Sequence, residues 1–136
     1  MKTVLRSAAL LLAAMTVLCL VSCGGKIPAE GLWESATYRA DTTVGSGKNE
    51  VKIDIEAGDS SITVTLMTDI PTLGAALFAE GLIEDPSFFS TLNGITADWN
   101  ADQAYWAFYK GDEYMNVGVA ETAIVGGEHF RFVYTK

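Results

Sequence analysis

Two neighbouring segments near the middle of the chain alternate between apolar and polar residues. In residues 51–56 (Val-Lys-Ile-Asp-Ile-Glu) every second side chain is apolar, and residues 61–67 (Ser-Ile-Thr-Val-Thr-Leu-Met) repeat this pattern. A period of two is typical of a strand with one buried face and one solvated face. Residues 57–60 (Ala-Gly-Asp-Ser) favour a turn, so the two strands are predicted to form a β-hairpin.

The apolar spacing then becomes helical. The sequence Leu-Gly-Ala-Ala-Leu at residues 73–77 places its large apolar side chains on one face, which predicts a short helix over residues 73–80. Thr72 is expected to cap the start of this helix with its side chain, and Gly81 is expected to end the helix.

The second half of the chain returns to strand patterns. Residues 105–109 (Tyr-Trp-Ala-Phe-Tyr) favour a strand, and residues 114–117 are expected to pair back on it. Residues 130–134 (Phe-Arg-Phe-Val-Tyr) place three aromatic side chains on one face. This order of elements predicts the α+β class, with a β-grasp-like mixed sheet packed against one short helix and the last strand in the middle of the sheet.

The remaining segments show no sustained period. Residues 32–38 are expected to pack on the domain as an N-terminal arm, and residues 41–47 and 98–102 are predicted to be loops. Residues 84–93 are expected to be irregular, with a Phe-Phe pair and a closing Asn-Gly turn. Residues 118–123 are expected to form a single turn at most.

The N-terminus has the pattern of a bacterial lipoprotein signal. A short basic start and an apolar stretch over residues 8–21 lead to Leu-Val-Ser-Cys at residues 20–23. We predict that residues 1–22 are a signal peptide, that Cys23 carries the lipid, and that residues 23–31 are a tether to the membrane. The alternative is an ordinary secretory signal with an incidental cysteine. Both interpretations place the domain outside the cytoplasm.

Charge and cysteine content narrow the function classes. The formal net charge is −8, which disfavours nucleic acid as a partner. After removal of the signal peptide, Cys23 is the only cysteine left, so no disulfide or thiolate metal site is expected within the chain. We expect residues 32–136 to form one monomeric domain whose stability comes from packing.

Several short segments carry a resemblance to a known family. They are Trp-Glu-Ser-Ala-Thr-Tyr (33–38), Asp-Thr-Thr-Val-Gly-Ser-Gly (41–47), Thr-Leu-Gly-Ala-Ala-Leu (72–77), Gly-Leu-Ile (81–83), Asn-Gly-Ile-Thr-Ala-Asp (93–98), Ala-Tyr-Trp-Ala-Phe-Tyr (104–109), Gly-Val (118–119) and Tyr-Thr (134–135). In this order they resemble the transcobalamin-like C-terminal domain family, which is found in many lipoproteins of gut and other Gram-positive bacteria.

The resemblance implies a β-grasp fold related to the small domain that covers cobalamin in animal cobalamin carriers. It also suggests capture of cobalamin or a related small molecule at the cell surface, for delivery to a transporter partner. This chain departs from the family pattern in residues 84–92, which are shorter than the glycine-rich stretch common there.

The aromatic strand is the first candidate binding site. Alternation puts Trp106 and Phe108 on one face of the strand, and Tyr105 and Tyr109 on the other. We predict that Tyr105, Trp106, Tyr109 and Trp99 contact a flat or apolar ligand, because aromatic faces with polar tips suit such ligands. The alternative is that the helix and the N-terminal arm cover both faces.

Asp98, Asn100 and Asp102 form the second candidate site. Alternate oxygen ligands on a tight loop match the opening of a calcium-binding loop. The rest of the loop does not match, because Gln103 stands where Gly is expected and Tyr109 stands where a bidentate Glu is expected. The alternative is an Asx-rich turn that caps its own backbone.

No catalytic site is expected. His129 is the single histidine, and it offers no assignable partners for a Ser-His-acid arrangement. Three hypotheses follow: capture of a ligand such as cobalamin, a protein-interaction or structural module, and a calcium-binding domain. An exposed Trp106 or Tyr109 beside a concavity favours the first, and burial of both with an unpaired strand edge favours the second. Converging oxygens around Asp98 and Asp102 favour the third.

Overall fold

The computed structural model describes residues 26–136. The predicted signal peptide and Cys23 lie outside these residues, so the lipid anchor stays a prediction. The elements in chain order are η1 (Gly31–Trp33), β1 (Thr42–Gly45), β2 (Asn49–Ala57), β3 (Ser60–Thr68), α2 (Leu73–Ala79), β4 (Thr91–Leu92), β5 (Ile95–Thr96), α3 (Trp99–Asp102), β6 (Tyr105–Lys110), β7 (Glu113–Tyr114), η2 (Val119–Glu121) and β8 (His129–Thr135). Within residues 26–136, no helix is long and apolar enough to cross a membrane.

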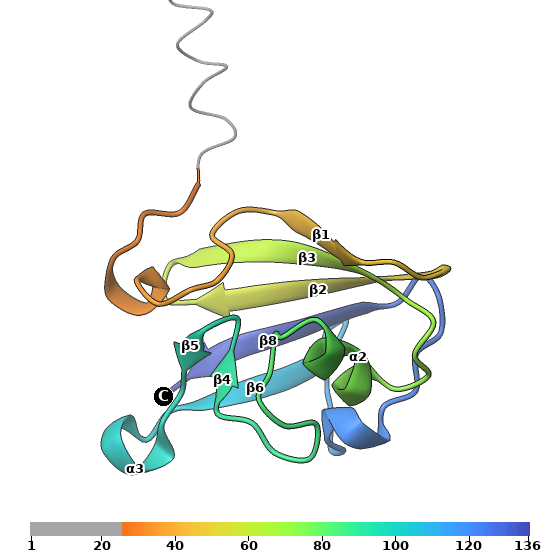
Figure 1. The fold of residues 1–136 in the computed structure, drawn as a ribbon. Coiled ribbons are helices and arrows are strands. Elements are labelled where there is room, and N and C mark those ends of the chain that lie inside the picture. Colours follow the sequence, from red (N-terminus) through yellow and green to blue (C-terminus); the bar gives the residue numbers. More distant parts are fainter. Residues whose placement is uncertain (1–25) are drawn as a thin grey trace, which may run out of the picture.

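The main sheet has six strands in the order β1-β3-β2-β8-β6-β7 (Figure 1). Strands β2 and β3 form the predicted antiparallel hairpin, in which Ile53 lies opposite Val64. The last strand, β8, lies in the interior of the sheet, parallel to β2 and antiparallel to β6. The predicted α+β class, with its mixed sheet and interior last strand, is confirmed.

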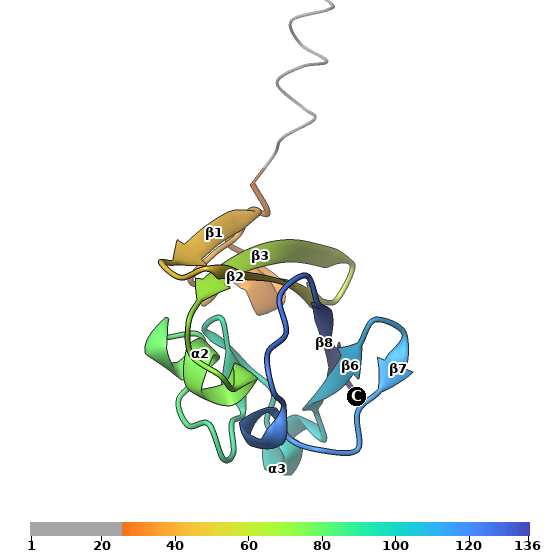
Figure 2. The ribbon, with the colours of Figure 1, turned by 90° about the vertical axis from the view of Figure 1, so that its right-hand side faces the viewer.

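The alternating strands bury one face of the sheet. From Val51 in β2 and from Ile62 in β3, every second residue has an exposed fraction of at most 6%, whereas the intervening residues keep contact with solvent. Helix α2 lies on the buried side of the curved sheet, beside the small β4–β5 hairpin (Figures 1 and 2). The largest fully buried side chains come from β8, β2 and α2, so the core lies between the sheet and this layer.

Helix α2 ends as the sequence predicts but starts differently. Gly81 has φ of +71°, and the amide of Leu82 donates to the carbonyl oxygen of Leu77 at 2.9 Å. This Schellman arrangement brings Leu82 into the core. The predicted side-chain cap is wrong, because Thr72 makes no cap hydrogen bond. Its neighbour along the chain, Leu73, instead donates its amide to the carbonyl oxygen of Thr122, which ties the helix start to η2.

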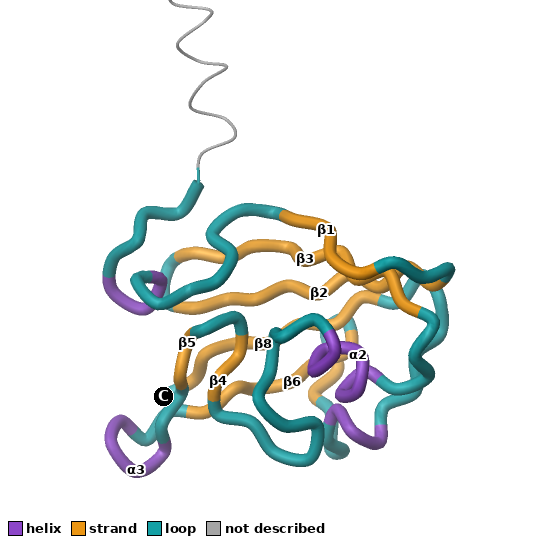
Figure 3. Tube along the Cα trace, in the orientation of Figure 1, coloured by secondary structure: helices purple, strands orange, loops and turns teal. Residues whose placement is uncertain are grey.

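Two predicted loops contain regular structure (Figure 3). Residues 42–45 form β1, which pairs in parallel with β3 and buries Val44 against the core. Residues 99–102 form α3, a single helical turn. Both segments are too short to show a period, and β1 forms because it completes the edge of the sheet.

The N-terminal arm packs on the domain as predicted. Trp33 is buried, and its Nε1 donates to the carbonyl oxygen of Ala57 at 3.0 Å. Further towards the N-terminus, Ile27 donates its amide to the carbonyl oxygen of Arg39, and Arg39 Nη1 donates to the carbonyl oxygen of Ile27. Ile27 of the predicted tether is therefore held against Arg39, the residue that follows the arm.

Candidate functional site

Strand β6 presents two aromatic side chains to the inner side of the sheet. Phe108 is buried and stacks on Phe132 of β8, with ring centroids 4.9 Å apart and planes at 11°. Trp106 is only partly buried, and its ring packs edge-on against Tyr134 with centroids 5.7 Å apart. Strand pairing between β6 and β8 fixes both contacts, since Trp106 lies opposite Tyr134 and Phe108 opposite Phe132.

The indole of Trp106 is held in place from the side of the β4–β5 hairpin. Its Nε1 donates to the carbonyl oxygens of Ser90 at 3.1 Å and Ile95 at 3.3 Å. A ring whose polar edge is satisfied by backbone groups presents its remaining surface in one orientation.

A loop over residues 84–91 lies opposite β6, and one carboxylate closes it. Glu84 Oε1 accepts hydrogen bonds from the amide of Ser90 at 2.7 Å, the amide of Thr91 at 3.2 Å and the hydroxyl of Ser90 at 3.2 Å. Desolvation by partial burial raises the pKa of Glu84, but these hydrogen bonds favour the ionised form, and the pKa of Glu84 is lowered overall.

The tip of this loop carries two phenylalanines with different environments. Phe89 turns towards the core and contacts Phe132 edge-on, with ring centroids 6.0 Å apart. Phe88 has an exposed fraction of 77%, the highest among the exposed large apolar residues of the described chain. Exposure of a large aromatic side chain on an ordered loop is typical of a contact surface.

The closed loop gives a pH-dependent prediction. A carboxyl group with a lowered pKa stabilises the folded state above its unfolded pKa and loses this contribution as the pH falls through its folded pKa. As the pH falls below 4.5, the usual pKa of a glutamate, we therefore expect the hydrogen bonds from Ser90 and Thr91 to the Glu84 carboxylate to weaken. The NMR amide proton signals of Ser90 and Thr91 should then shift together. In Glu84→Gln these two signals should not follow the same titration. If the Ser90 and Thr91 amide signals stayed constant in the native protein down to about pH 2, their hydrogen bonds to the Glu84 carboxylate would be contradicted.

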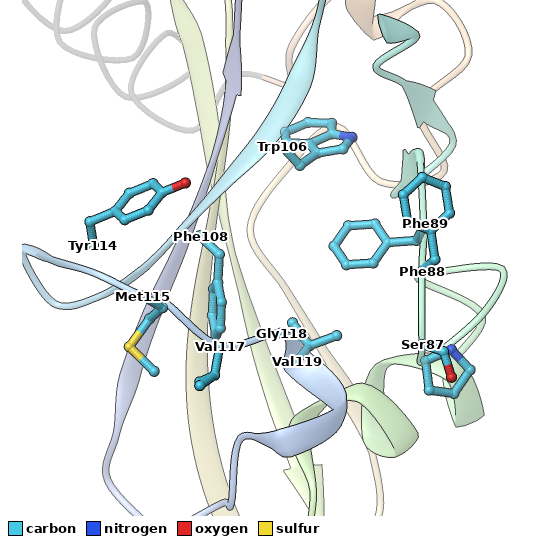
Figure 4. A pocket seen from close by; sticks show the side chains of 11 residues that line it. Ser87, Phe88, Phe89, Trp106, Phe108, Tyr114, Met115, Val117, Gly118 and Val119 are labelled. Carbon is cyan, nitrogen blue, oxygen red and sulfur yellow. The ribbon is translucent and has the colours of Figure 1, made fainter.

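The first hollow lies between the loop and the inner side of β6 (Figure 4). Its volume is about 240 Å³, and most of its lining residues are apolar or aromatic. It is lined by Pro86, Ser87, Phe88, Phe89, Trp106, Phe108, Tyr114, Met115, Val117, Gly118 and Val119. Figure 4 shows Phe88 and Phe89 on one side of this space, with Trp106 and Phe108 facing them from the strand.

A second hollow of about 470 Å³ adjoins the first, because Phe88, Phe89 and Trp106 line both. The second hollow is lined by Phe88, Phe89, Ser90, Ala97, Asp98, Trp99, Asn100, Ala104, Tyr105 and Trp106. Three of its aromatic residues are among the exposed large side chains of the protein, namely Phe88, Trp99 and Tyr105. Most of the exposed aromatic surface is therefore gathered around one pair of hollows.

The structure brings together three of the four predicted ligand-binding residues. Trp99, Tyr105 and Trp106 line the second hollow, and Trp99 packs edge-on against Tyr105 with ring centroids 6.4 Å apart. Tyr109 shares with Tyr105 the face of β6 opposite Trp106, but Tyr105 is the first residue of the strand and follows α3, whereas the Arg131 guanidinium covers the Tyr109 ring at 4.5 Å from the centroid. Tyr109 lines neither hollow. A partly exposed Trp106 beside a concavity favours the ligand-capture hypothesis.

The predicted calcium residues lie at α3. Asp98 caps this helix: its Oδ1 accepts hydrogen bonds from the amides of Asn100 at 2.9 Å and Ala101 at 3.1 Å. Across residues 26–136, no group of three or more His, Cys, Asp or Glu side chains is arranged to hold a metal ion. The cap is the arrangement that the alternative interpretation expects, and the calcium set of Asp98, Asn100 and Asp102 stays a prediction.

Four residues that line the first hollow were not among the predicted site residues, namely Phe88, Phe89, Met115 and Val117. Phe88 and Phe89 stood in a segment with no periodicity, and Met115 and Val117 stood in a segment that was expected to be a strand. Strand β7 is Glu113–Tyr114, so only Tyr114 of the predicted strand 114–117 lies in it. Met115 and Val117 instead lie in the connection to η2 and line the first hollow. The adjacent Phe-Phe pair after Pro86 was the available signal, because consecutive side chains on an irregular segment point in different directions.

The fold and the two hollows define a small α+β domain with an aromatic surface site. No protein-family model and no curated protein sequence matches the chain. Among solved structures, the chain is similar to a candidate metal binding protein from Ruminococcus gnavus ATCC 29149, with a TM-score of 0.60 and 25% identity, covering 65% of this chain and 98% of that one.

A second similar structure is haptocorrin in complex with Cbi, with a TM-score of 0.46 and 18% identity. That match covers 68% of this chain and 26% of haptocorrin, so the chain spans about a quarter of haptocorrin's length. The resemblance to the transcobalamin-like C-terminal domain family stays a prediction.

Proposed function

We propose that this chain is a ligand-binding domain that covers one face of a small molecule with a flat apolar surface, with a corrinoid as the first candidate. In this proposal the domain lies outside the cytoplasm, a lipid on Cys23 holds it at the membrane, and the captured ligand passes to a transporter. The sequence resemblance suggests the corrinoid, and the aromatic site supports a flat ligand in general.

The observation that carries the proposal is that Phe88 and Trp106 line both hollows. In this proposal a corrinoid lies across the pair of hollows and rests on these two side chains. The Trp106 ring is preorganised by the hydrogen bonds of Nε1, which lowers the entropy lost on binding. Phe88 adds an exposed ring, and burial of this ring against a ligand would stabilise the complex.

Metal binding is the second candidate function. Support comes from the description of the similar Ruminococcus gnavus protein as a candidate metal binding protein. In this chain the candidate ligands are Asp98, Asn100 and Asp102, of which Asp98 already uses Oδ1 to cap α3. Calcium binding would therefore recruit its other carboxylate oxygen.

Thermal unfolding with and without ligand tests the proposal. At about 100 times its dissociation constant, a ligand stabilises the folded state by roughly 2.7 kcal/mol. For a domain of this size the midpoint should then rise by about 10 °C or more. We expect cyanocobalamin or dicyanocobinamide to produce such a rise, and calcium chloride serves as the arm for the second candidate.

Phe88→Ala and Phe78→Ala form a matched pair for this test. Phe88 lines both hollows, whereas Phe78 is an exposed ring on α2 that lines neither. We expect Phe88→Ala to weaken corrinoid binding about ten-fold, which corresponds to roughly 1.4 kcal/mol, and Phe78→Ala to leave it unchanged. No rise with any corrinoid would exclude the first candidate, and a rise with calcium alone would favour the second. If neither ligand acts, the protein-interaction module becomes the preferred hypothesis.

A further inference from the structure

The second hollow combines an aromatic wall with a carboxylate. Five aromatic residues line it, namely Phe88, Phe89, Trp99, Tyr105 and Trp106. Asp98 is the only ionisable acid or base among the lining residues apart from the phenol of Tyr105. No Lys, Arg or His lines the hollow. The faces of aromatic rings carry negative potential, so rings and carboxylate together favour a positive ligand.

The local chain conformation fixes this arrangement. Asp98 Oδ1 accepts two amide hydrogen bonds at the start of α3, and Gln103 ends that turn in the left-handed conformation with φ of +54°. The amide of Ala104 then donates back to the carbonyl oxygen of Asp98 at 3.3 Å. This closed turn places Trp99 and Tyr105 at its two ends, where their rings contact each other.

One oxygen of Asp98 is available for a ligand. Both cap hydrogen bonds end on Oδ1, so Oδ2 takes no part in the helix cap. Calcium needs six or more oxygen ligands, whereas the side chains that line this hollow offer oxygens only from Ser90, Asp98, Asn100 and Tyr105. A quaternary or tertiary ammonium group instead has a diffuse charge and an apolar surface, which rings and one carboxylate satisfy without an oxygen shell.

We infer that the second hollow is a binding site for an organic cation, in which a methylated ammonium group lies among Trp99, Tyr105 and Trp106 with Asp98 as its counter-charge. The overall charge of −8 supports such a ligand by raising the concentration of cations near the surface. This inference goes beyond the proposed function and does not depend on corrinoid binding.

Choline and 3,3-dimethyl-1-butanol test the inference directly, because they share a shape and differ in charge. Titration of the purified protein is followed by tryptophan fluorescence, in which Trp99 and Trp106 are expected to respond, whereas Trp33 is buried and does not line the hollow. We expect saturable binding of choline with a Kd of about 1 mM or tighter, and at least about ten-fold weaker binding of the neutral alcohol. Equal affinity for the two compounds, or no saturation by choline, would overturn the inference.

Asp98→Asn tests the counter-charge without removing the helix cap, because Asn also accepts amide hydrogen bonds at this position. We expect it to weaken choline binding about ten-fold and to leave the neutral alcohol unaffected. Asp112→Asn is the matched control, since it removes one exposed negative charge from a turn that does not line the hollow. Unchanged choline affinity in Asp98→Asn would contradict the assignment. Calcium binding lost in Asp98→Asn, together with no choline binding, would overturn it in favour of a metal site.

A lipid headgroup carries the same ammonium group as free choline. Co-sedimentation with phosphatidylcholine vesicles, compared with vesicles of phosphatidylglycerol, separates these sources. We expect free choline to bind and the vesicles to add little, because the acidic protein repels the headgroup phosphate. Corrinoid binding is measured on the same samples. A failure of organic-cation binding can then be distinguished from a failure of corrinoid binding.

Discussion

Phe132→Ala is expected to lower the free energy of unfolding by about 3–5 kcal/mol, a typical cost for truncating a buried phenylalanine. Phe132 is fully buried in β8, stacks on Phe108 at 4.9 Å and supports Phe89 at 6.0 Å. The substitution therefore removes a core side chain and the support of the loop that carries Phe88. Chemical denaturation measures the loss of stability, and chymotrypsin cleavage after Phe88 and Phe89 measures the loosening of the loop.

Phe130→Ala separates these two effects. Phe130 is also fully buried in β8 and contacts Phe108 at 5.7 Å, but no contact with Phe89 is found for it. We expect a comparable loss of stability, with less acceleration of cleavage at the loop than in Phe132→Ala. Equal cleavage rates in the two variants would mean that global unfolding, rather than the Phe89–Phe132 contact, controls access to the loop.

The elements predicted correctly from the sequence are those whose burial imposes a period. Strands β2 and β3 had to alternate because one face is buried, and α2 had to repeat its apolar residues at helical spacing. Gly81 was recognised as the end of α2 because a left-handed residue is needed there. The interior position of β8 was predicted from the order of elements.

The elements that were missed depend on contacts distant in sequence. Strand β1 has one buried apolar residue, Val44, and its pairing with β3 requires a parallel connection that no local pattern indicates. The loop over residues 84–91 is shaped by the Glu84 carboxylate, which reaches backbone amides six and seven residues away. The sequence could name Trp99, Tyr105 and Trp106 as site residues, but not the loop that completes the two hollows.

Asn93→Ala is expected to lower the free energy of unfolding by about 3 kcal/mol or more. The sequence pattern predicted a turn at Asn93 and nothing more, yet the residue is fully buried. Its Oδ1 accepts the amide of Tyr38 at 2.9 Å, and its Nδ2 donates to the carbonyl oxygen of the same residue at 2.9 Å. Each partner group left unpaired by the substitution costs about 1–3 kcal/mol. Alanine also pays for the left-handed backbone at φ of +55°, by roughly 1 kcal/mol.

Asn93→Gly separates the cost of the left-handed backbone from the cost of the lost hydrogen bonds, and Asn100→Ala is the control for loss of an exposed asparagine. Glycine tolerates the left-handed backbone, so Asn93→Gly should be more stable than Asn93→Ala by about 1 kcal/mol while still losing both hydrogen bonds to Tyr38. Asn100 is exposed and its side chain makes no hydrogen bond in the described structure, so its replacement should change stability by less than about 0.5 kcal/mol.

The hydrogen bonds of Asn93 join three parts of the fold, namely the segment after α2, the β4–β5 turn and the N-terminal arm. The amide of Asn93 donates to the carbonyl oxygen of Leu82 after α2, and its carbonyl oxygen accepts the amide of Thr37 in the N-terminal arm. Loss of the side-chain bonds should therefore release the arm before the sheet unfolds, which hydrogen exchange at Thr37 and Tyr38 would detect. If these amides exchanged only with the β2 and β3 core in Asn93→Gly, the arm would be held by Trp33 packing and not by Asn93.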